Sequence, residues 1–509
     1  MNNQAITKTS KTPSFGVALL PLIFMVVVLI TGIIFLKIDI KVLLVIAATF
    51  TTIQALILGH TWKDIEKEAI SKLAKAFPAV LILIFVGFMI GTWIVSGTIP
   101  YLVYMGLQII SPKYIVITSF LVTVILSVST GTSWGAVGTV GAALMSVAAG
   151  MGAPLAAVAG AIVSGAYFGD KMSPLSDSTN MSAIATNTNL YQHIGHMFYT
   201  TIPGFIVCCI VYVIAGLSFA SEGSINEVDM IVQNLNQLFN FSSVSVALIL
   251  LPPVIVLVGS VKKLPTIPVM ITSAMFSIIL AMTLQGFSLD AVTSSVVSGF
   301  KMEMFVNPVV DLTTIPQQIP KLLQRGGMVS MMNSVLTAYC AFIFIGALSV
   351  SGSLDVILPR VMKGIKSTGN LVATTVVTGV STITIIGEAT ISFLMIGGLF
   401  REEYVKRGLA TKNLSRTLED SITVIEPIVP WSLAGIYMAS NLGVSTIEYA
   451  PWACLCYTGA IFAVIWGYTG VGIAKLKKGE DGYDEYLKLN QENEADQTIL
   501  EVDGIILNQ

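Results

Sequence analysis

Two acids stand in a stretch of hydroxyl side chains that directly follows an apolar segment. Asp170 and Asp177 both lie within GAYFGDKMSPLSDSTN, residues 165–180. Pro174 between them should break the helix, because proline lacks an amide hydrogen and clashes with the preceding turn. An acid inside a membrane is expensive and by default indicates a functional site. The alternative is structural, with Asp170 paired to Lys171 and Asp177 capping a helix. The polar residues assigned to this candidate site are Asp170, Ser173, Ser176, Asp177, Ser178, Thr179 and Asn180.

A second candidate lies at residues 127–139, where SVSTGTSWGAVGT interrupts an apolar region with hydroxyls and three glycines. Such a break survives in a membrane only where it lines a cavity or packs against other helices. Its half-helix ends, carbonyls and hydroxyls would offer hard ligands to a small cation, or a helix N-terminus to an anion. Tight packing of small residues between helices is the alternative. The residues assigned here are Thr130, Gly131, Thr132 and Ser133.

Further acids occur about 250 residues later, in the repeat-related part of the chain described below. Glu388 lies in a run of apolar and hydroxyl residues far from any loop signal, so we expect it to be buried. Glu426 precedes a proline and is assigned to the same site by the repeat. Glu419 and Asp420 follow the basic Arg416 so closely that they are also consistent with caps of the next helix.

Two histidines follow the first group of acids. His193 and His196 are three residues apart, which places them near one another on a helix. A zinc site is weakly supported, because no third nitrogen, sulfur or carboxylate ligand stands at matching spacing. A gating or pH-sensing role and a plain interfacial role are equally consistent with the pattern.

Composition indicates which elements must position these residues. Hydrophobic residues make up 54% of the 509 positions and charged residues 11%, against roughly 25% charged in soluble domains. The fold class that we predict is therefore an all-α polytopic membrane protein. The first apolar run is followed by Lys37-Ile38-Asp39 and not by a small-residue cleavage site, so it should remain as a helix. The net charge of -2 argues against a nucleic-acid partner, and no nucleophile–base pair, metal set or phosphate loop indicates an enzyme.

The chain repeats itself. Val95–Ile99 returns as Val350–Leu354, and the Gly131–Trp134 turn returns at Gly387–Thr390. A third match, Thr188-Asn189-Leu190 with Ser440-Asn441-Leu442, keeps the same order and nearly the same separation, which indicates a duplicated unit. In a membrane protein, duplication around glycine-broken polar segments is typical of transporters with broken helices or re-entrant hairpins.

Loop charges orient the two repeats, because cytoplasmic loops carry excess Lys and Arg. Residues 99–113 contain one basic residue, whereas their repeat partner contains Arg360, Lys363 and Lys366. Equivalent loops therefore fall on opposite faces, which predicts inverted-topology repeats with a substrate site near the midplane. Residues 285–327 fit this scheme least well. The basic residues that place the N-terminus and the loop before the first repeat inside are Lys8, Lys11, Lys63, Lys67, Lys72 and Lys75.

These patterns divide the chain into five parts. We expect N-terminal helices and a cytoplasmic loop (1–75), a first repeat (76–240), connecting helices and a loop (241–327) and a second, inverted repeat (328–478). The polar, weakly patterned tail (479–509) should dangle in the cytoplasm. The five cysteines lie in apolar stretches without metal-like spacing and are read as packing residues.

Three strings carry a resemblance to a known family. They are GTSWGAVGTVGAALM (131–145), GAYFGDKMSPLSDSTN (165–180) and HIGHMFYTTIPG (193–204), and they resemble the NhaC family of bacterial sodium/proton antiporters. The resemblance implies a multi-pass protein of the bacterial cytoplasmic membrane that carries Na+ and H+ without a resident cofactor. It implies that Thr130, Thr132, Ser133, Asp170 and Asp177 are site residues, and it suggests a homodimer.

The predicted function is exchange of Na+ for H+ at buried carboxylates by alternating access, with Asp170, Asp177 and Glu388 as the expected Na+ ligands. A buried carboxylate holds its proton more tightly, so one site can bind either ion but not both. The alternative is sodium- and proton-coupled exchange of an organic anion such as malate or lactate, or of an amino acid. The acid at Glu388 would repel an anion and favours the cation. Membrane lipid and small ions are the expected partners, with small organic anions under the alternative.

Overall fold

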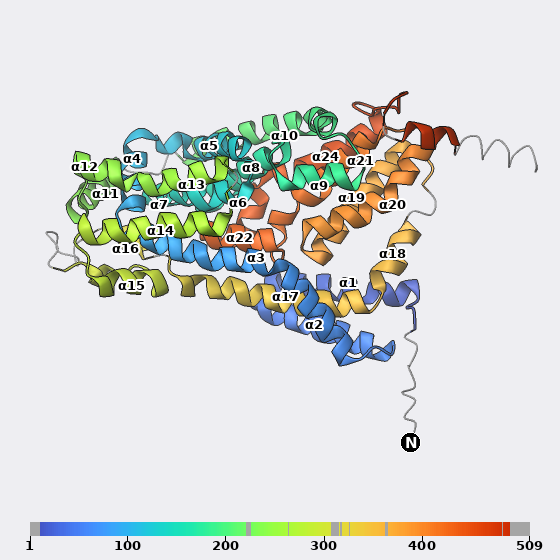
Figure 1. Ribbon diagram of the computed structural model, residues 1–509, viewed down its shortest axis with the longest axis horizontal. Coiled ribbons are helices and arrows are strands. Elements are labelled where there is room, and N and C mark those ends of the chain that lie inside the picture. The colour runs from blue at the N-terminus through green and yellow to red at the C-terminus, as the bar shows by residue number, and fades with distance from the viewer. Residues whose placement is uncertain are drawn as a thin grey trace, which may run out of the picture.

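The protein is a bundle of helices, seen here in a computed structural model (Figure 1). The structure describes residues 11–219, 225–262, 264–306, 315, 318–324, 326–361, 365–480 and 482–488. Within these residues there is no strand, and one isolated antiparallel bridge joins Leu409 to Lys475. Eight helices in the described part of the chain are long and apolar enough to cross a membrane, and up to twelve if each of four bent pairs is one crossing. The predicted all-α polytopic membrane fold is confirmed.

The elements follow the chain in four groups. Before the break at Gly97 come α1 (Phe15–Ile30), α2 (Ile40–Ile57) and α3 (Trp62–Val95). The first repeat continues with α4 (Thr98–Ile109), α5 (Ile115–Thr130), α6 (Ser133–Ala136), α7 (Ala142–Gly150), α8 (Leu155–Met172), α9 (Asp177–Ala185), α10 (Leu190–Phe219) and α11 (Ile225–Leu238). The connecting part holds α12 (Ser243–Ile249), α13 (Leu251–Val261), α14 (Thr266–Thr283), α15 (Leu289–Ser298) and α16 (Gln318–Leu323). The second repeat holds α17 (Met332–Val350), α18 (Ser353–Val361), α19 (Thr368–Ile386), α20 (Ala389–Lys406), α21 (Thr411–Leu418), α22 (Leu433–Leu442), α23 (Thr446–Tyr449) and α24 (Cys454–Thr469).

The repeat in the sequence returns as repeated local geometry. Helices α5 and α19 end at Gly131 and Gly387, whose φ angles of 71° and 66° lie in the left-handed region that favours glycine. The next residue is extended in both places, with φ and ψ of -144° and 121° at Thr132 and -145° and 126° at Glu388. Each of these residues then caps a new helix. The two polar breaks are therefore the same structural device.

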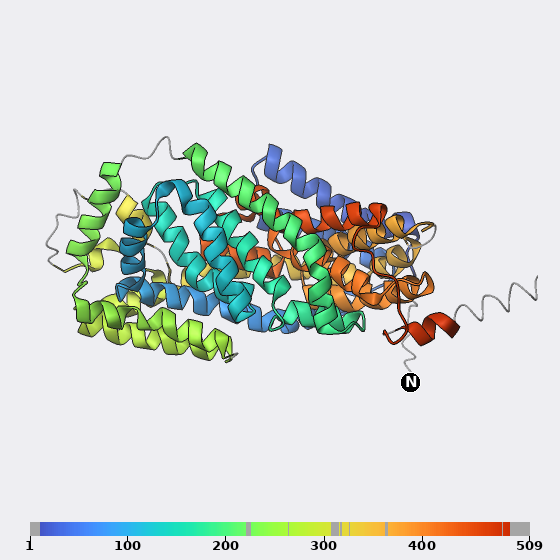
Figure 2. The same cartoon turned by 90° about the horizontal axis from the view of Figure 1, so that it is seen from above.

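The two broken hairpins enter the molecule from opposite ends. In Figure 1, α5, α6 and α8 lie to the left of α19 and α20. The view from above in Figure 2 shows the same division, with the teal part of the chain to the left of the orange part. This arrangement agrees with inverted-topology repeats whose breaks meet in the middle.

Close helix packing supports the first break. The α5–α8 contact is the most extensive between any two elements of the described chain, and glycines on α8 permit it. A methyl group on Gly169 would lie 2.3 Å from the backbone nitrogen of Val128, and one on Gly165 would lie 2.5 Å from the carbonyl oxygen of Phe120. Small-residue packing therefore occurs beside the break and holds it in place.

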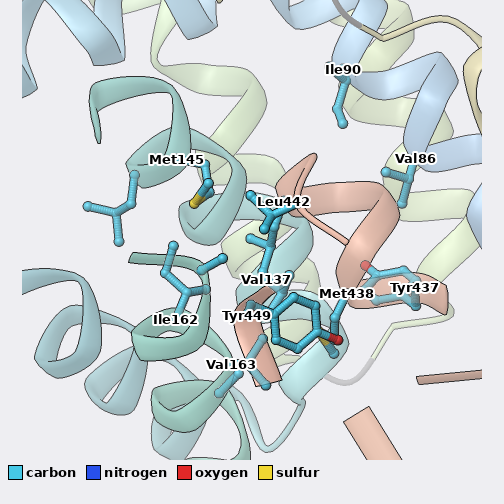
Figure 3. Close-up of a cluster of buried hydrophobic side chains, with 14 of the residues drawn as sticks. Val86, Ile90, Val137, Met145, Ile162, Val163, Tyr437, Met438, Leu442 and Tyr449 are labelled. Carbon is cyan, nitrogen blue, oxygen red and sulfur yellow. The ribbon is translucent and has the colours of Figure 1, made fainter. Parts of the chain in front are cut away.

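The apolar core continues around this region (Figure 3). Side chains from α3, α7, α8 and α22 meet there, with Val86, Met145, Ile162 and Leu442 all buried. Tyr449 of α23 joins them. The core fixes the first-repeat hairpin against α22 of the second repeat.

Three expectations about domain edges require correction. Residues 63–75, expected as a loop, form the first part of α3, because a capping box of Thr61 and Asp64 starts that helix early. The boundary after residue 75 therefore falls inside a helix. The start of the tail does not dangle, because Glu480 pairs with Lys412 and Glu485 pairs with Arg401, both at 2.8 Å. Lys8, Lys363 and residues 489–509 lie outside the described residues.

Candidate functional site

The two breaks meet at one internal cavity of about 620 Å³. Thr130, Gly131, Thr132 and Ser133 line it from the first repeat, and Glu388, Ala389 and Thr390 line it from the second. Four acids face this space, namely Asp170, Asp177, Glu388 and Glu426, and no Lys or Arg is among the lining residues that the structure describes. The sequence-predicted residues from both repeats are thus brought together around an acidic cavity.

The first break offers hydroxyls to this cavity. Thr132 caps α6, and its Oγ1 accepts a hydrogen bond from the Gly135 amide at 3.2 Å. Thr130 is buried and donates to the Leu126 carbonyl at 2.9 Å. A methyl group on Gly131 would lie 2.5 Å from Cβ of Leu175, so a glycine is needed here on steric as well as conformational grounds. The break is therefore held rigidly beside the loop that follows Asp170.

Glu388 caps the equivalent helix of the second repeat. Its two carboxylate oxygens accept hydrogen bonds from the amides of Thr390 at 3.0 Å and Ile391 at 2.9 Å. The expectation that Glu388 is buried was wrong, because the side chain is half-buried at the cavity wall. A carboxylate on its own helix N-terminus already occupies the place where an anionic ligand would bind.

Asp170 is the most strongly positioned acid of the site. Ser133 Oγ donates to its Oδ2 at 2.8 Å, and Ser176 Oγ lies 2.5 Å from its Oδ1. Ser133 belongs to the first break and Ser176 to the turn after α8, so this half-buried carboxylate ties the two sequence motifs together. An acid held by two hydroxyls is oriented for binding a proton or a small cation.

The residues after Pro174 have mixed roles. Asp177 is the first residue of α9, exposed toward the cavity. Thr179 donates to the Asp170 carbonyl at 2.7 Å, and Ser173 donates to the Val128 carbonyl at 3.0 Å. Asn180 donates to the Ser176 carbonyl at 2.6 Å. Of this group, Asp177 and Ser178 line the cavity, and the other three residues shape the turn.

Lys171 does not pair with Asp170, which corrects the structural alternative considered from sequence. Its ammonium group instead forms an ion pair with Asp420 of the second repeat, and the exposed fractions of the two side chains are 1% and 0%. Asp420 and Glu419 lie in a buried π-helical turn, Glu419–Thr423, and therefore do not cap an exposed helix end. Neither Glu419 nor Asp420 was assigned to the site from sequence, although acids at membrane depth were a signal for both.

Glu426 is half-buried in the turn that follows, and its side chain shares the cavity with Asp170 and Glu388. Its carbonyl accepts from Ser432 Oγ at 2.6 Å, which holds the turn before α22. The acids do not gather into a ready-made metal site. Among the described residues, no three His, Cys, Asp or Glu side chains are close enough to hold a metal ion. Asp170, Asp177 and Glu388 thus stand around a shared space and do not form one three-acid cluster.

The two histidines lie away from the cavity. Both are buried on α10 and face α21, where His193 Nδ1 contacts Ser415 Oγ at 2.8 Å and His196 Nε2 contacts Asn413 Oδ1 at 3.1 Å. These contacts fit the interfacial role. A gating or pH-sensing role for the pair stays a prediction.

An aromatic pair at the cavity was missed from sequence. Trp134 and Tyr437 stack with ring centroids 4.2 Å apart, and the Tyr437 hydroxyl donates to the Trp134 carbonyl at 2.8 Å. The two residues are 303 positions apart, so no local pattern could pair them. They join the first break to α22 and give the cavity one flat apolar wall.

A multi-span helical fold in which two repeat-related breaks meet at an internal acidic cavity defines a membrane transport protein. The profile of the Na+/H+ antiporter family matches residues 165–471. A Haemophilus influenzae protein named as an uncharacterized Na(+)/H(+) antiporter is 46% identical over 93% of this chain and 99% of its own. The Na(+)/H(+) antiporter NhaC of Alkalihalophilus pseudofirmus is 34% identical over 91% of this chain and 98% of its own. The Bacillus subtilis malate-2H(+)/Na(+)-lactate antiporter is 34% identical over 86% of this chain and 91% of its own. The chain belongs to the Na+/H+ antiporter family.

Proposed function

We propose that the protein exchanges Na+ for H+ across the bacterial cytoplasmic membrane at the carboxylates of the central cavity. The observation that carries this proposal is the charge of the cavity wall, whose described residues include four acids and no Lys or Arg. Such a wall attracts cations and repels anions. Carboxylate and hydroxyl oxygens are also the ligands that hard cations prefer.

Exchange follows from competition. A carboxylate such as Asp170 binds either a proton or, when ionised, a sodium ion. Inverted repeats permit the cavity to open to one face at a time. A bound Na+ must then leave before a proton can take its place, and a bound proton must leave before Na+ can bind. We assign ion binding to Asp170, Asp177, Glu388 and Glu426, with the hydroxyls of Thr132 and Ser133 as additional ligands.

The second candidate is exchange of a small organic anion together with these ions. The cavity of about 620 Å³ favours it, since small-molecule sites span roughly 300–1,000 Å³ and a sodium ion needs far less space. The name of the malate/lactate relative points the same way. An anion would nevertheless find no cationic side chain among the described residues of the cavity wall, and Glu388 already occupies the N-terminus of α20.

The test uses the purified protein in proteoliposomes with an enclosed pH dye. We expect an imposed Na+ gradient to drive proton flux in the opposite direction without any organic solute. Addition of malate, lactate or amino acids should leave this flux unchanged. A strict requirement for one of these solutes would replace the first proposal with the second, and an absence of flux under all conditions would reject both.

The remaining assignments belong to the same proposal. We assign both chain ends to the cytoplasmic face, because basic residues near a membrane span favour that face. The transport unit is a homodimer, which cross-linking in native membranes would test. Na+ and H+ are cargo, and no resident cofactor is needed for exchange.

A further inference from the structure

A chain of hydroxyls connects the cavity to a carboxyl outside it. Ser176 Oγ lies 2.5 Å from Oδ1 of Asp170 and 3.0 Å from Oγ of Ser178, and Ser178 Oγ lies 3.1 Å from Oε1 of Glu419. Asp170 lines the cavity, whereas Glu419 is fully buried and is not among the lining residues. This chain of hydroxyls therefore connects Asp170 of the first repeat to Glu419 of the second, two residues that are 249 positions apart in sequence.

Counting hydrogens determines how this chain is protonated. It has three O···O contacts, but the two serines supply only two hydrogens. If both carboxyls were ionised, each serine would donate to its own acid and no hydrogen would lie between the serine oxygens. The two serine oxygens are 3.0 Å apart, within hydrogen-bond distance, and a hydrogen bond in each of the three contacts needs one protonated carboxyl group.

We propose that Glu419 is a proton-binding residue that shares one proton with Asp170 through Ser176 and Ser178. With the proton on Glu419, each group donates toward Asp170. With the proton on Asp170, every hydrogen bond reverses. The transfer is balanced, because Asp170 gives a hydrogen to Ser176, Ser176 gives its own to Ser178, and Ser178 gives its own to Glu419.

The surroundings of Glu419 suit a carboxyl that gains and loses a proton. Its Oε2 is buried and has no hydrogen-bond partner among the described residues. The neighbouring charges are Lys171, which is already paired with Asp420, and Arg416, which donates to the Gly472 carbonyl at 2.8 Å. From α10, His193 faces the same region through Ser415. None of these charged groups forms an ion pair with Glu419, so its charge is not committed to a fixed partner.

This inference rests on the proposed Na+/H+ exchange and extends it. The proton that sodium displaces is held by the pair and not by Asp170 alone. The shared proton reaches Asp170 through the two serines and passes to solvent in the cavity, and sodium binds the ionised carboxylate that remains. A proton stored behind the cavity wall also leaves the cavity itself free for the cation.

The experiment measures protons released per Na+ bound by the purified full-length protein in detergent, with a pH dye and 22Na+. Glu419→Gln keeps the shape and can still donate to Ser178, but it cannot exchange a proton. We expect this variant to bind Na+ and to lose the proton release that accompanies binding. Its Na+-induced infrared difference spectrum should also lack the C=O band of a protonated carboxyl.

Matched serine variants on α9 isolate the relay. Ser178→Ala cuts the chain and should lose proton release, whereas Ser178→Thr should restore it. Ser182→Ala is the control, because Ser182 is one turn further along, is buried, and donates to the Ser415 carbonyl at 2.8 Å outside the relay. It should behave as the wild type.

Each result decides the proposal. Wild-type proton release from Glu419→Gln would overturn it, as would a folded Glu419→Gln protein that binds no Na+, since the proposal leaves the cation ligands in place. If Glu419→Gln does not fold, undiminished proton release from folded Ser178→Ala would reject the relay. Failure of the wild-type protein to bind Na+ or release protons would instead reject the proposed function.

Discussion

At the scale of single residues, Asp170 and Asp177 should differ although both line the cavity. Asp170 is half-buried and held by two serines, whereas Asp177 is exposed at the start of α9. Because charges interact more strongly away from water, Asp170→Asn should weaken Na+ binding by about 100-fold or more, and Asp177→Asn by about tenfold. Isothermal titration with NaCl measures both affinities. Equal, small losses would remove Asp170 from its central role.

Glu388 has two functions that substitution can separate. Glu388→Ala removes the cap of α20 and should cost about 1 kcal/mol of stability. Glu388→Gln keeps an oxygen for the amides of Thr390 and Ile391 but removes the charge, so stability should change little while Na+ affinity falls. Thermal melts in detergent and Na+ titrations on the same samples test this. Unchanged affinity in both variants would leave Glu388 with the capping function alone.

Residue types indicated which acids line the cavity more readily than which groups those acids contact. Asp170 and Asp177 were predicted from the cost of a carboxyl at membrane depth, and Glu388 and Glu426 from their positions in the repeat. The alternative in which Lys171 pairs with Asp170, its neighbour in sequence, is wrong, because its actual partner Asp420 lies 249 residues away. Glu419 was left open for the same reason. Its burial depends on how α21 packs, which no local pattern reveals.

At the scale of elements, the two glycine breaks should respond differently to the same change. Gly131→Ala adds left-handed strain of about 1–2 kcal/mol and also a clash with Leu175 at 2.5 Å. Gly387→Ala adds similar strain, but the nearest heavy atom would be 3.5 Å away. Gly131→Ala should therefore lower the melting temperature and transport more.

Gly398→Ala is the control for this pair, because an added methyl on the exposed face of α20 would have nothing within 4 Å. This variant should leave the melting temperature and transport unchanged or raise the melting temperature slightly. Alanine is more favourable than glycine in a helix by roughly 1 kcal/mol. Similar losses at Gly131 and Gly387 would mean that packing against Leu175 contributes little to the first break.

The breaks were predictable because glycine and hydroxyl residues disfavour a continuous membrane helix. The start of α3 and the start of the tail were harder to predict. The basic segment 63–75 resembled a loop, yet it forms the first part of the 34-residue helix α3 because the capping box of Thr61 and Asp64 starts that helix. The tail resembled a free polar segment, and its docking by Glu480 and Glu485 depends on distant basic residues of α20 and α21.

At the scale of the whole molecule, the inverted arrangement makes a topological prediction. Ser111 precedes α5 and Lys366 precedes α19, so they are repeat-equivalent, and both are exposed. In a background without native cysteines, Ser111→Cys should react with an impermeant thiol reagent from outside intact cells. Lys366→Cys should react only after the membrane is opened. Labelling of both from one face would contradict the inverted repeats.

The ion pair between Lys171 and Asp420 should matter to the molecule as a whole because it joins the repeats. Asp420→Asn leaves a buried ammonium group without its partner and should destabilise the protein by about 3–5 kcal/mol. The double variant Lys171→Met with Asp420→Leu removes both charges and should recover much of that loss. Melting temperatures in detergent compare them, and a double variant no more stable than Asp420→Asn would contradict this account.

The ion pair between Lys171 and Asp420 also affects when each repeat can reach its final position during synthesis. Lys171 is translated 249 residues before Asp420, so each newly made chain inserts a lysine into the membrane whose counter-charge does not yet exist. Until the second repeat arrives, that ammonium must stay near the lipid headgroups or water, and α8 cannot reach its final depth. Completion of the first repeat therefore waits for the ribosome to finish the second, and the two halves mature as one unit.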